Sequence, residues 1–188
     1  MKGPVVSGRP VLSPVMLIGQ APGTHEGPAG KPFAWTAGKT MFKWFADLGL
    51  DEESFRSRVY MAAVCRCFPG KDIKGSGDRV PAPDEIARCA DHLAAEVALL
   101  QPRLVIPVGK LAIVQVLPTA TQLVDVVGKT HTVTFHGVTT DIVPLPHPSG
   151  ASTWHRTEPG KTLLSRALAA LGRHEAWKRL LSPQGARA

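Results

Sequence analysis

A polar loop near the start of the chain carries side chains suited to catalysis. An apolar stretch, residues 15–18, leads into residues 19–26, which read GQAPGTHE. The carboxyl group of Glu26 and the imidazole of His25 are groups that can position water or transfer protons. Gly19 and Gly23 lack side chains, so a ligand can approach the backbone closely there. The loop therefore predicts a ligand site directly after a strand.

A histidine between two prolines occupies a second loop, near the other end of the chain. Residues 145–150 read LPHPSG and follow a further apolar stretch. Pro146 and Pro148 restrict the backbone and so hold His147 in place. Ligands of open α/β sheets bind where loops leave the carboxyl ends of the strands. If the two strands are neighbours or near neighbours, one cleft collects Gln20, His25, Glu26 and His147.

Alternating strands and helices must position these two loops. Four apolar stretches predict strands, at residues 15–18, 59–64, 103–109 and 140–145. Helical spacing of apolar residues and helix-start signals predict helices in residues 37–48, 83–100, 110–117, 160–171 and 174–181. Residues 118–138 are ambiguous, with a β-excursion around residues 132–135.

Strands that are almost wholly apolar and alternate with helices are typical of a parallel sheet covered on both faces. A chain of 188 residues is long enough for one sizeable core. We therefore predict the α/β class and a single domain over residues 1–188. Its architecture is expected to be a three-layer α/β/α sandwich with a central, mainly parallel four-stranded sheet.

The bulk composition is that of an ordinary globular protein, with 44% hydrophobic and 20% charged residues. No apolar run approaches the roughly 18 residues that a membrane span needs. The first residues lack the basic start, apolar run and small-residue cleavage site of a secretory signal. We therefore expect a cytoplasmic protein that makes no membrane contact.

The chain is basic, with a net charge of +7 and a pI near 9.7. Basic patches attract polyanions such as nucleic acid, although a net positive charge can also serve solubility alone. One basic group lies in a glycine-rich stretch and comprises Lys71, Lys74 and Arg79. After residue 150, two glutamates accompany seven bases: Arg156, Lys161, Arg166, Arg173, Lys178, Arg179 and Arg187.

Three cysteines, Cys65, Cys67 and Cys89, are present. An odd number without a secretory signal argues against a disulfide framework. The Cys65-x-Cys67 spacing is not that of a tight zinc pair, and the chain has no second pair. Buried free thiols are the simpler interpretation.

The two loops together resemble the uracil-DNA glycosylase superfamily, over roughly residues 15–170. Residues 19–23 (GQAPG), Glu26, Gly30 and Pro32-Phe33 resemble the first motif of the family 4 enzymes, GEAPG followed by G-x-PF. Residues 147–149 (HPS) resemble the second motif, and residues 62–67 resemble a segment of the family 5 enzymes. Each fragment alone is a weak signal, but their order and spacing along the chain make the resemblance specific.

The resemblance implies a base-excision repair enzyme that flips uracil out of DNA and hydrolyses its N-glycosidic bond. The products are free uracil and an abasic site in single- or double-stranded DNA. No lysine is placed by motif to form a Schiff base, so we expect no strand cleavage. We expect the enzyme to act as a monomer.

The resemblance also implies roles for individual residues. His147 faces the O2 oxygen of uracil, and Phe33 stacks on the flipped base; the alternatives are a structural histidine and a core aromatic ring. The expected catalytic group is His147, Glu26, Gln20 and His25. The expected substrate-binding group is Gly19, Ala21, Phe33, Ala63 and Ser149. The expected DNA-binding group is Pro148, Gly150, Ser152, Arg156 and Lys161.

Three substitutions separate the chain from the pattern of those families. Gln20 stands where the first motif has Glu, Thr36 where family 5 has Asp, and Ala63 where family 4 has the Asn that reads the uracil edge. An amide cannot take a proton from water at neutral pH, which leaves Glu26, then His25, to handle the water. Glu26 has a second interpretation, as a carboxylate that braces the loop.

The cysteine set is a fourth departure. The resemblance implies a [4Fe–4S] cluster held by four thiolates. Cys67 and Cys89 match the two later ligands, but the upstream pair has no counterpart. We therefore predict no iron–sulfur cluster, no other cofactor and no metal.

Three alternative functions remain open from the sequence. Because Ala63 replaces the residue that reads uracil, the enzyme could excise other deaminated bases, such as hypoxanthine or xanthine. Because two acids are missing, the protein could instead bind uracil-containing or abasic DNA without catalysis. The remaining alternative is a metal-binding redox protein that uses the three cysteines.

Overall fold

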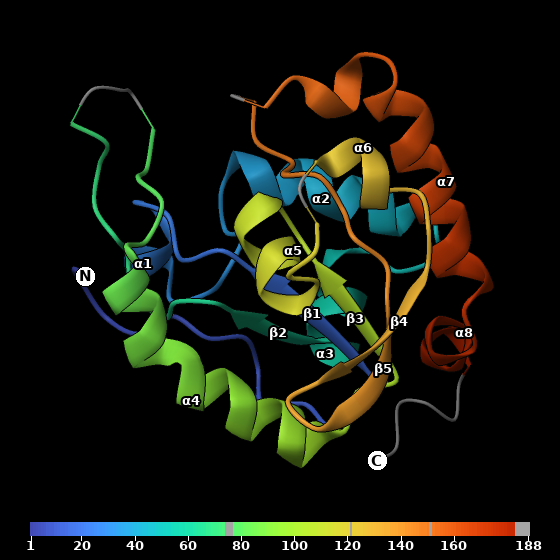
Figure 1. Cartoon of the computed structure of the whole chain (residues 1–188), viewed down its shortest axis with the longest axis horizontal. Coiled ribbons are helices and arrows are strands. Elements are labelled where there is room, and N and C mark those ends of the chain that lie inside the picture. The colour runs from blue at the N-terminus through green and yellow to red at the C-terminus, as the bar shows by residue number, and fades with distance from the viewer. Residues whose placement is uncertain (74–76, 121, 151, 183–188) are drawn as a thin grey trace.

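The computed structural model describes residues 1–73, 77–120, 122–150 and 152–182 (Figure 1). Two predicted basic residues, Lys74 and Arg187, lie outside the described residues. The strands are β1 (Val15–Gly19), β2 (Tyr60–Ala63), β3 (Leu104–Pro107), β4 (His131–Phe135) and β5 (Val138–Ile142). The helices are α1 (Glu26–Ala29), α2 (Thr36–Ala46), α3 (Glu52–Arg58), α4 (Pro83–Leu100), α5 (Lys110–Val116), α6 (Leu123–Val126), the 3₁₀ turn η1 (Trp154–Arg156), α7 (Gly160–Arg173) and α8 (Glu175–Leu181).

The strands form one sheet in the order β2-β1-β3-β5-β4. The first four in that order run parallel, and they correspond to the four predicted strands. β1 and β5 are near neighbours with β3 between them, as the convergence of the two loops requires. The predicted three-layer α/β sandwich is confirmed, and the sheet has a fifth strand in the described residues.

The fifth strand, β4, lies in the ambiguous region and pairs antiparallel with β5. Its residues alternate polar and apolar along HTVTF, so it reads as a half-exposed edge strand rather than a buried one. His136 and Gly137 join β4 to β5 with φ of 46° and 80°. Two positive φ angles in a two-residue connection are typical of a type I′ hairpin turn. The prediction of four strands was therefore one short.

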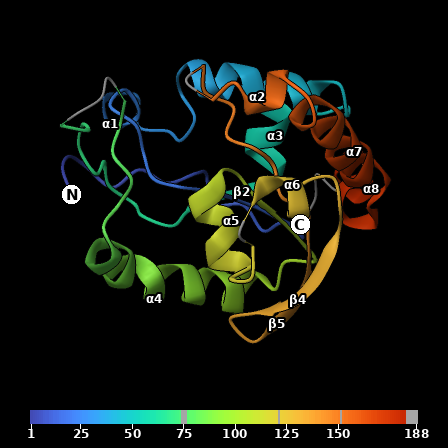
Figure 2. The ribbon, with the colours of Figure 1, turned by 45° about the horizontal axis from the view of Figure 1, so that its top comes forward.

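Helices cover both faces of the sheet, and alternate residues of β1 pack against helices on opposite faces. Val15 and Leu17 pack in a cluster with residues of α2, α3, α7 and α8. Met16 and Ile18 pack in a second cluster with residues of α4 and α5. Figures 1 and 2 show α2 and α7 on one side of the sheet and α4 on the other. The sheet is therefore a rigid base for the loops that leave its strands.

Helix α3 was not predicted, because its sequence, EESFRSR, has little apolar periodicity. It begins after Gly49, whose φ of 90° favours glycine. Its N-cap is Asp51, whose side chain accepts a hydrogen bond of 2.8 Å from the Ser54 amide. Among the described residues, no helix has the length and apolar character to cross a membrane.

Candidate active site

A cavity of about 510 Å³ opens at the carboxyl ends of the parallel strands. Its walls are the ends of β1 and β2, the loop that follows β1, a segment within residues 69–80, and the loop that follows β5. The structure brings together all predicted catalytic and substrate-binding residues at this cavity: Gly19, Gln20, Ala21, His25, Glu26, Phe33, Ala63, His147 and Ser149.

His147 lies in the cavity wall with an uncharged ring. Burial, followed by the nearby His155, lowers the pKa of His147 below its ordinary value. The Ser149 amide donates a hydrogen bond of 3.3 Å to Nδ1 of His147. Because Nδ1 accepts, the proton of the neutral ring is assigned to Nε2. His147 can therefore donate one hydrogen bond from Nε2 without carrying charge.

A glycine at the end of β3 makes room for this ring. A Cβ atom at Gly109 would lie 3.2 Å from Cδ2 and 3.4 Å from Cβ of His147. Gly109 also has a φ of 85°, a conformation that residues with side chains rarely adopt. Gly109, two residues after β3, therefore leaves the space that the His147 ring occupies.

Phe33 lines the cavity with its ring beside the last residue of β1. A Cβ atom on Gly19 would lie 3.1 Å from Cε2 of Phe33, so this position tolerates little beyond glycine. The backbone of Phe33 is left-handed, with φ of 53°, which is uncommon outside glycine. A ring next to bare backbone at a strand end is suited to stacking on a planar ligand.

Glu26 opens the short helix α1 and is half-buried at the cavity. Burial raises the pKa of Glu26 to about 7, although the amides of Gly23 and Phe33 and the charge of Arg56 act in the opposite direction. A carboxyl group with a pKa near neutrality is suited to accept a proton at physiological pH. The role of Glu26, as proton acceptor or as loop brace, stays a prediction.

Gln20, His25 and Ala63 occupy different parts of the cavity wall. Gln20 is half-buried, and its carbonyl accepts a hydrogen bond from the Cys65 amide that ties the loop to the end of β2. His25 is exposed at the rim and stacks on Trp35, with ring centroids 4.3 Å apart. Ala63 ends β2 directly beside Gly19 and presents no polar side chain. The catalytic roles of Gln20 and His25 stay predictions.

A family model decides how this arrangement is classified. The model of the Uracil DNA glycosylase superfamily matches residues 6–172. The chain belongs to this superfamily. The resemblance predicted from the two loops is therefore confirmed.

Curated relatives in the superfamily are similar to most of this chain. A type-4 uracil-DNA glycosylase of Archaeoglobus fulgidus is 27% identical over 139 residues, which cover 72% of the chain and 65% of that protein. One of Pyrobaculum aerophilum is 30% identical over 139 residues, covering 72% and 66%. A type-5 uracil-DNA glycosylase of Pyrobaculum aerophilum is 30% identical over 109 residues, covering 52% and 45%. The chain spans less than two thirds of the length of these relatives.

The cysteines of this superfamily member do not match a four-thiolate cluster. Three free cysteines are present, of which Cys65 is buried and Cys67 and Cys89 are half-buried. Burial and the neighbouring Cys89 raise the pKa of Cys65 to about 12. Among the described residues, no group of three or more Cys, His, Asp or Glu side chains is arranged to hold a metal ion.

The absence of a cluster stays a prediction with a direct test. Protein purified without air is expected to lack visible absorption and to contain less than stoichiometric iron, because only two of four ligand positions are filled. Visible spectroscopy and elemental analysis measure both. Stoichiometric iron with a visible band that bleaches on reduction would contradict the prediction.

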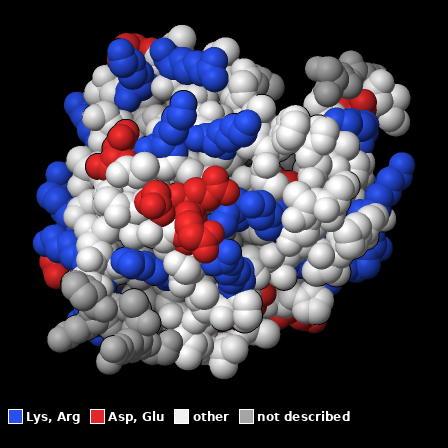
Figure 3. Space-filling model, turned by 180° about the vertical axis from the view of Figure 1, so that it is seen from behind, with Lys and Arg blue, Asp and Glu red and all other residues white. Residues whose placement is uncertain are grey.

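The predicted DNA-binding residues are not among those that line the cavity. Arg156 and Lys161 are exposed near the start of α7, Gly150 is exposed, and Ser152 is half-exposed. Pro148 is buried, so its position suits bracing of the His147 loop. DNA contact by this group stays a prediction. Figure 3 shows the face behind that of Figure 1, where basic side chains are widely spread and surround a central acidic group.

Sequence reasoning missed the segment that closes one side of the cavity. Asp78 accepts a hydrogen bond of 2.9 Å from the Thr24 hydroxyl and pairs with Lys71 at 2.9 Å. The first contact joins Asp78 to the first loop, the second joins Asp78 to Lys71, and both residues line the cavity. The glycine and basic residues of this stretch predicted a basic loop, but not a wall of the cavity. No local signal could reveal a contact between residues 54 positions apart.

Proposed function

We propose that this protein is a monofunctional uracil-DNA glycosylase, which hydrolyses the N-glycosidic bond of uracil in DNA. The substrate is single- or double-stranded DNA containing uracil, and the products are free uracil and an abasic site. One observation carries the proposal: a neutral histidine with its proton assigned to Nε2 lines the same cavity as an aromatic ring at a strand end. The names of the type-4 relatives support it.

The reaction needs stabilisation of the departing base. When the bond between C1′ of the sugar and N1 of uracil breaks, the electron pair leaves with the base and spreads to O2. A hydrogen bond from Nε2 of His147 stabilises that negative charge without a net charge of its own. Phe33 holds the flipped base by stacking, which contributes about 1–3 kcal/mol for a base on an aromatic ring.

Water then adds to the sugar at C1′. Its proton passes to Glu26, whose pKa of about 7 leaves it partly ionised at neutral pH. Gln20 can orient the water through its amide but cannot take the proton. Because Gln20 stands at the position of the acid in the first motif, Glu26 is the remaining carboxylate of this loop that can accept the proton.

The remaining parts of the proposal concern the setting of the reaction. Arg156, Lys161 and the backbone around Gly150 and Ser152 bind phosphates, which fix register without reading sequence. The enzyme acts as a monomer in the cytoplasm of a bacterium or archaeon, without membrane contact, metal or cluster. The archaeal relatives support the assignment to a bacterium or archaeon.

A panel of labelled oligonucleotides tests the proposed activity. Duplexes with uracil opposite guanine or adenine, and a uracil single strand, are expected to release uracil and to break only after alkali. Matched duplexes with hypoxanthine or xanthine test whether the enzyme also excises other deaminated bases. The apolar side chain of Ala63 at the cavity is the specific reason to expect this second activity. Release of a purine without uracil overturns the proposal. Tight binding of the uracil duplex without base release would identify a non-catalytic binder instead.

A further inference from the structure

A buried arginine lies directly behind the cavity, on a helix that contributes no cavity-lining residue. Arg56 belongs to α3, and only 6% of it is exposed. Arginine is almost never fully buried unless its donors are paired. The partners of the Arg56 donors therefore indicate the role of this buried side chain.

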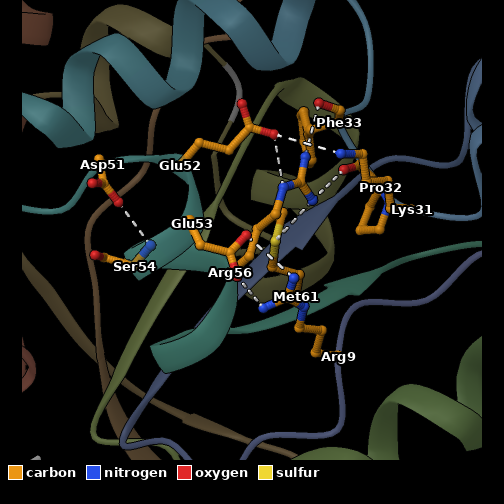
Figure 4. Close-up of polar contacts among 10 residues, drawn as sticks. All are labelled: Arg9, Lys31, Pro32, Phe33, Asp51, Glu52, Glu53, Ser54, Arg56 and Met61. Atoms are coloured by element: carbon orange, nitrogen blue, oxygen red, sulfur yellow. Dashed lines mark hydrogen bonds and ion pairs between the residues drawn. The ribbon is translucent and has the colours of Figure 1, made fainter. Parts of the chain in front are cut away.

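The guanidinium of Arg56 contacts the first loop and an acidic neighbour at once (Figure 4). Nη1 donates to the carbonyl oxygen of Pro32 at 2.9 Å, and Nη2 donates to that of Phe33 at 3.3 Å. Nε pairs with the Glu52 carboxylate at 2.9 Å. The plane lies over the ring of Phe42, 4.6 Å from its centroid. All sides of the group are thus engaged.

The two carbonyls that Arg56 holds belong to the residues that place the aromatic ring in the cavity. Phe33 keeps a left-handed backbone, with φ of 53°, which needs support from its surroundings. Its carbonyl also approaches Gly38 so closely that a Cβ atom there would lie 1.8 Å from the oxygen. Arg56 and Gly38 therefore confine this peptide group from two directions.

We propose that Arg56 is a positioning residue, which locks the Pro32 and Phe33 carbonyls and thereby sets the Phe33 ring beside Gly19. The inference deepens the proposed function, and its link to uracil rests on that function. The placement of the ring is a separate claim, which can be tested without any activity. Lysine cannot replace arginine here, because a single ammonium lacks the planar fork that reaches two carbonyls and a carboxylate together.

Proton NMR tests the placement directly. The Gly19 α-protons lie against the Phe33 ring, so its ring current shifts their resonances, and Phe33→Leu defines the value without a ring. In Arg56→Lys, these resonances are expected to move toward the Phe33→Leu value. The matched control is Arg58→Lys, because Arg58 of the same helix also donates to a carbonyl, that of Leu180 at 2.6 Å, away from the cavity. Arg56→Lys with wild-type Gly19 resonances overturns the proposal.

A milder variant keeps the test valid if Arg56→Lys does not fold. Glu52→Ala removes the acceptor at Nε on the exposed side of the network, and the Glu52 side chain is 46% exposed. Loss of this anchor is expected to shift the Gly19 resonances in the same direction by a smaller amount. Unchanged Gly19 resonances in Glu52→Ala would then count against the proposal.

A double-mutant cycle tests whether Arg56 acts through Phe33 in catalysis. Stacking energies of bases on aromatic rings correspond to about 5- to 150-fold in binding, so Arg56→Lys is expected to slow single-turnover uracil release about 10-fold. In the Phe33→Leu background the same change should alter the rate less than about 2-fold, because the ring is gone. Equal losses in both backgrounds reject the positioning role. A wild-type protein that releases no uracil instead defeats the proposed function, and the NMR result still decides the placement.

Discussion

Replacing His147 with Ala is expected to lower the single-turnover rate of uracil release by about 10²–10³-fold, the usual effect of removing one donor to a developing oxyanion. The Ser149 amide donates a hydrogen bond to Nδ1 of His147, so the ring proton is assigned to Nε2. This Nε2–H is the donor that the substitution removes. Burial keeps the ring neutral, so the donor is lost without loss of a charge. Rapid-quench measurement at saturating enzyme isolates the chemical step.

Two further variants separate the hydrogen bond from the general effect of losing an imidazole. His147→Gln retains a donor of similar reach and should recover part of the rate. His92→Ala removes an exposed histidine on α4 and should leave the rate unchanged. A His147→Ala enzyme within a few-fold of wild type would remove His147 from the mechanism and leave it a structural histidine.

The superfamily and the convergence of the two loops could be predicted from the sequence because the signals were local. Each loop follows an apolar strand, and parallel strands end at one edge of a sheet. In the observed strand order, β3 alone separates β1 from β5, so the loops that follow β1 and β5 meet at one cavity. The convergence needed only periodicity and glycine placement, and the superfamily came from the resemblance of the two loops to its motifs.

Other features of the site could not be read from the sequence, because they depend on contacts far apart in the chain. Arg56 stands in a charged stretch that suggests an exposed surface, and its burial comes from carbonyls more than 20 residues away. Asp78 likewise reaches Thr24 across the cavity. The β-excursion expected around residues 132–135 is strand β4, but its antiparallel pairing with β5 could not be predicted, because its alternating polar residues resemble those of an isolated exposed segment.

The pKa of Glu26 predicts opposite effects of one substitution on rate and on stability. Glu26→Gln is expected to lower uracil release about 10²-fold at pH 8, since a positioned base typically contributes at least that much. The wild-type rate should rise with pH through about 7 as Glu26 ionises. The Glu26→Gln rate should lack this rise, because an amide does not ionise in this pH range. Rates from pH 5.5 to 8.5 measure both profiles.

The same substitution is expected to stabilise the fold at alkaline pH. The folded carboxyl has a pKa of about 7 against 4.5 in the unfolded chain, so the folded state holds its proton more tightly between these values. Stability therefore falls as pH rises from 4.5 through 7, and the full loss is present above 7. At about 1.4 kcal/mol per pH unit the shift corresponds to roughly 3 kcal/mol, and partial exposure reduces this to about 1–2 kcal/mol. Glu26→Gln should be more stable than wild type by that amount at pH 8.5 and equal to it near pH 4.5.

Urea unfolding at the two pH values measures this difference, and Asp91→Asn, at an exposed position of α4, is the matched control. A gain at pH 8.5 together with the loss of rate would show that burial of Glu26 serves the reaction at the expense of the fold. A loop-bracing carboxylate predicts the reverse, since its removal should destabilise the loop and leave the pH profile of the rate in place. The two measurements on one variant therefore decide between the two roles, and they do so without reference to Gln20.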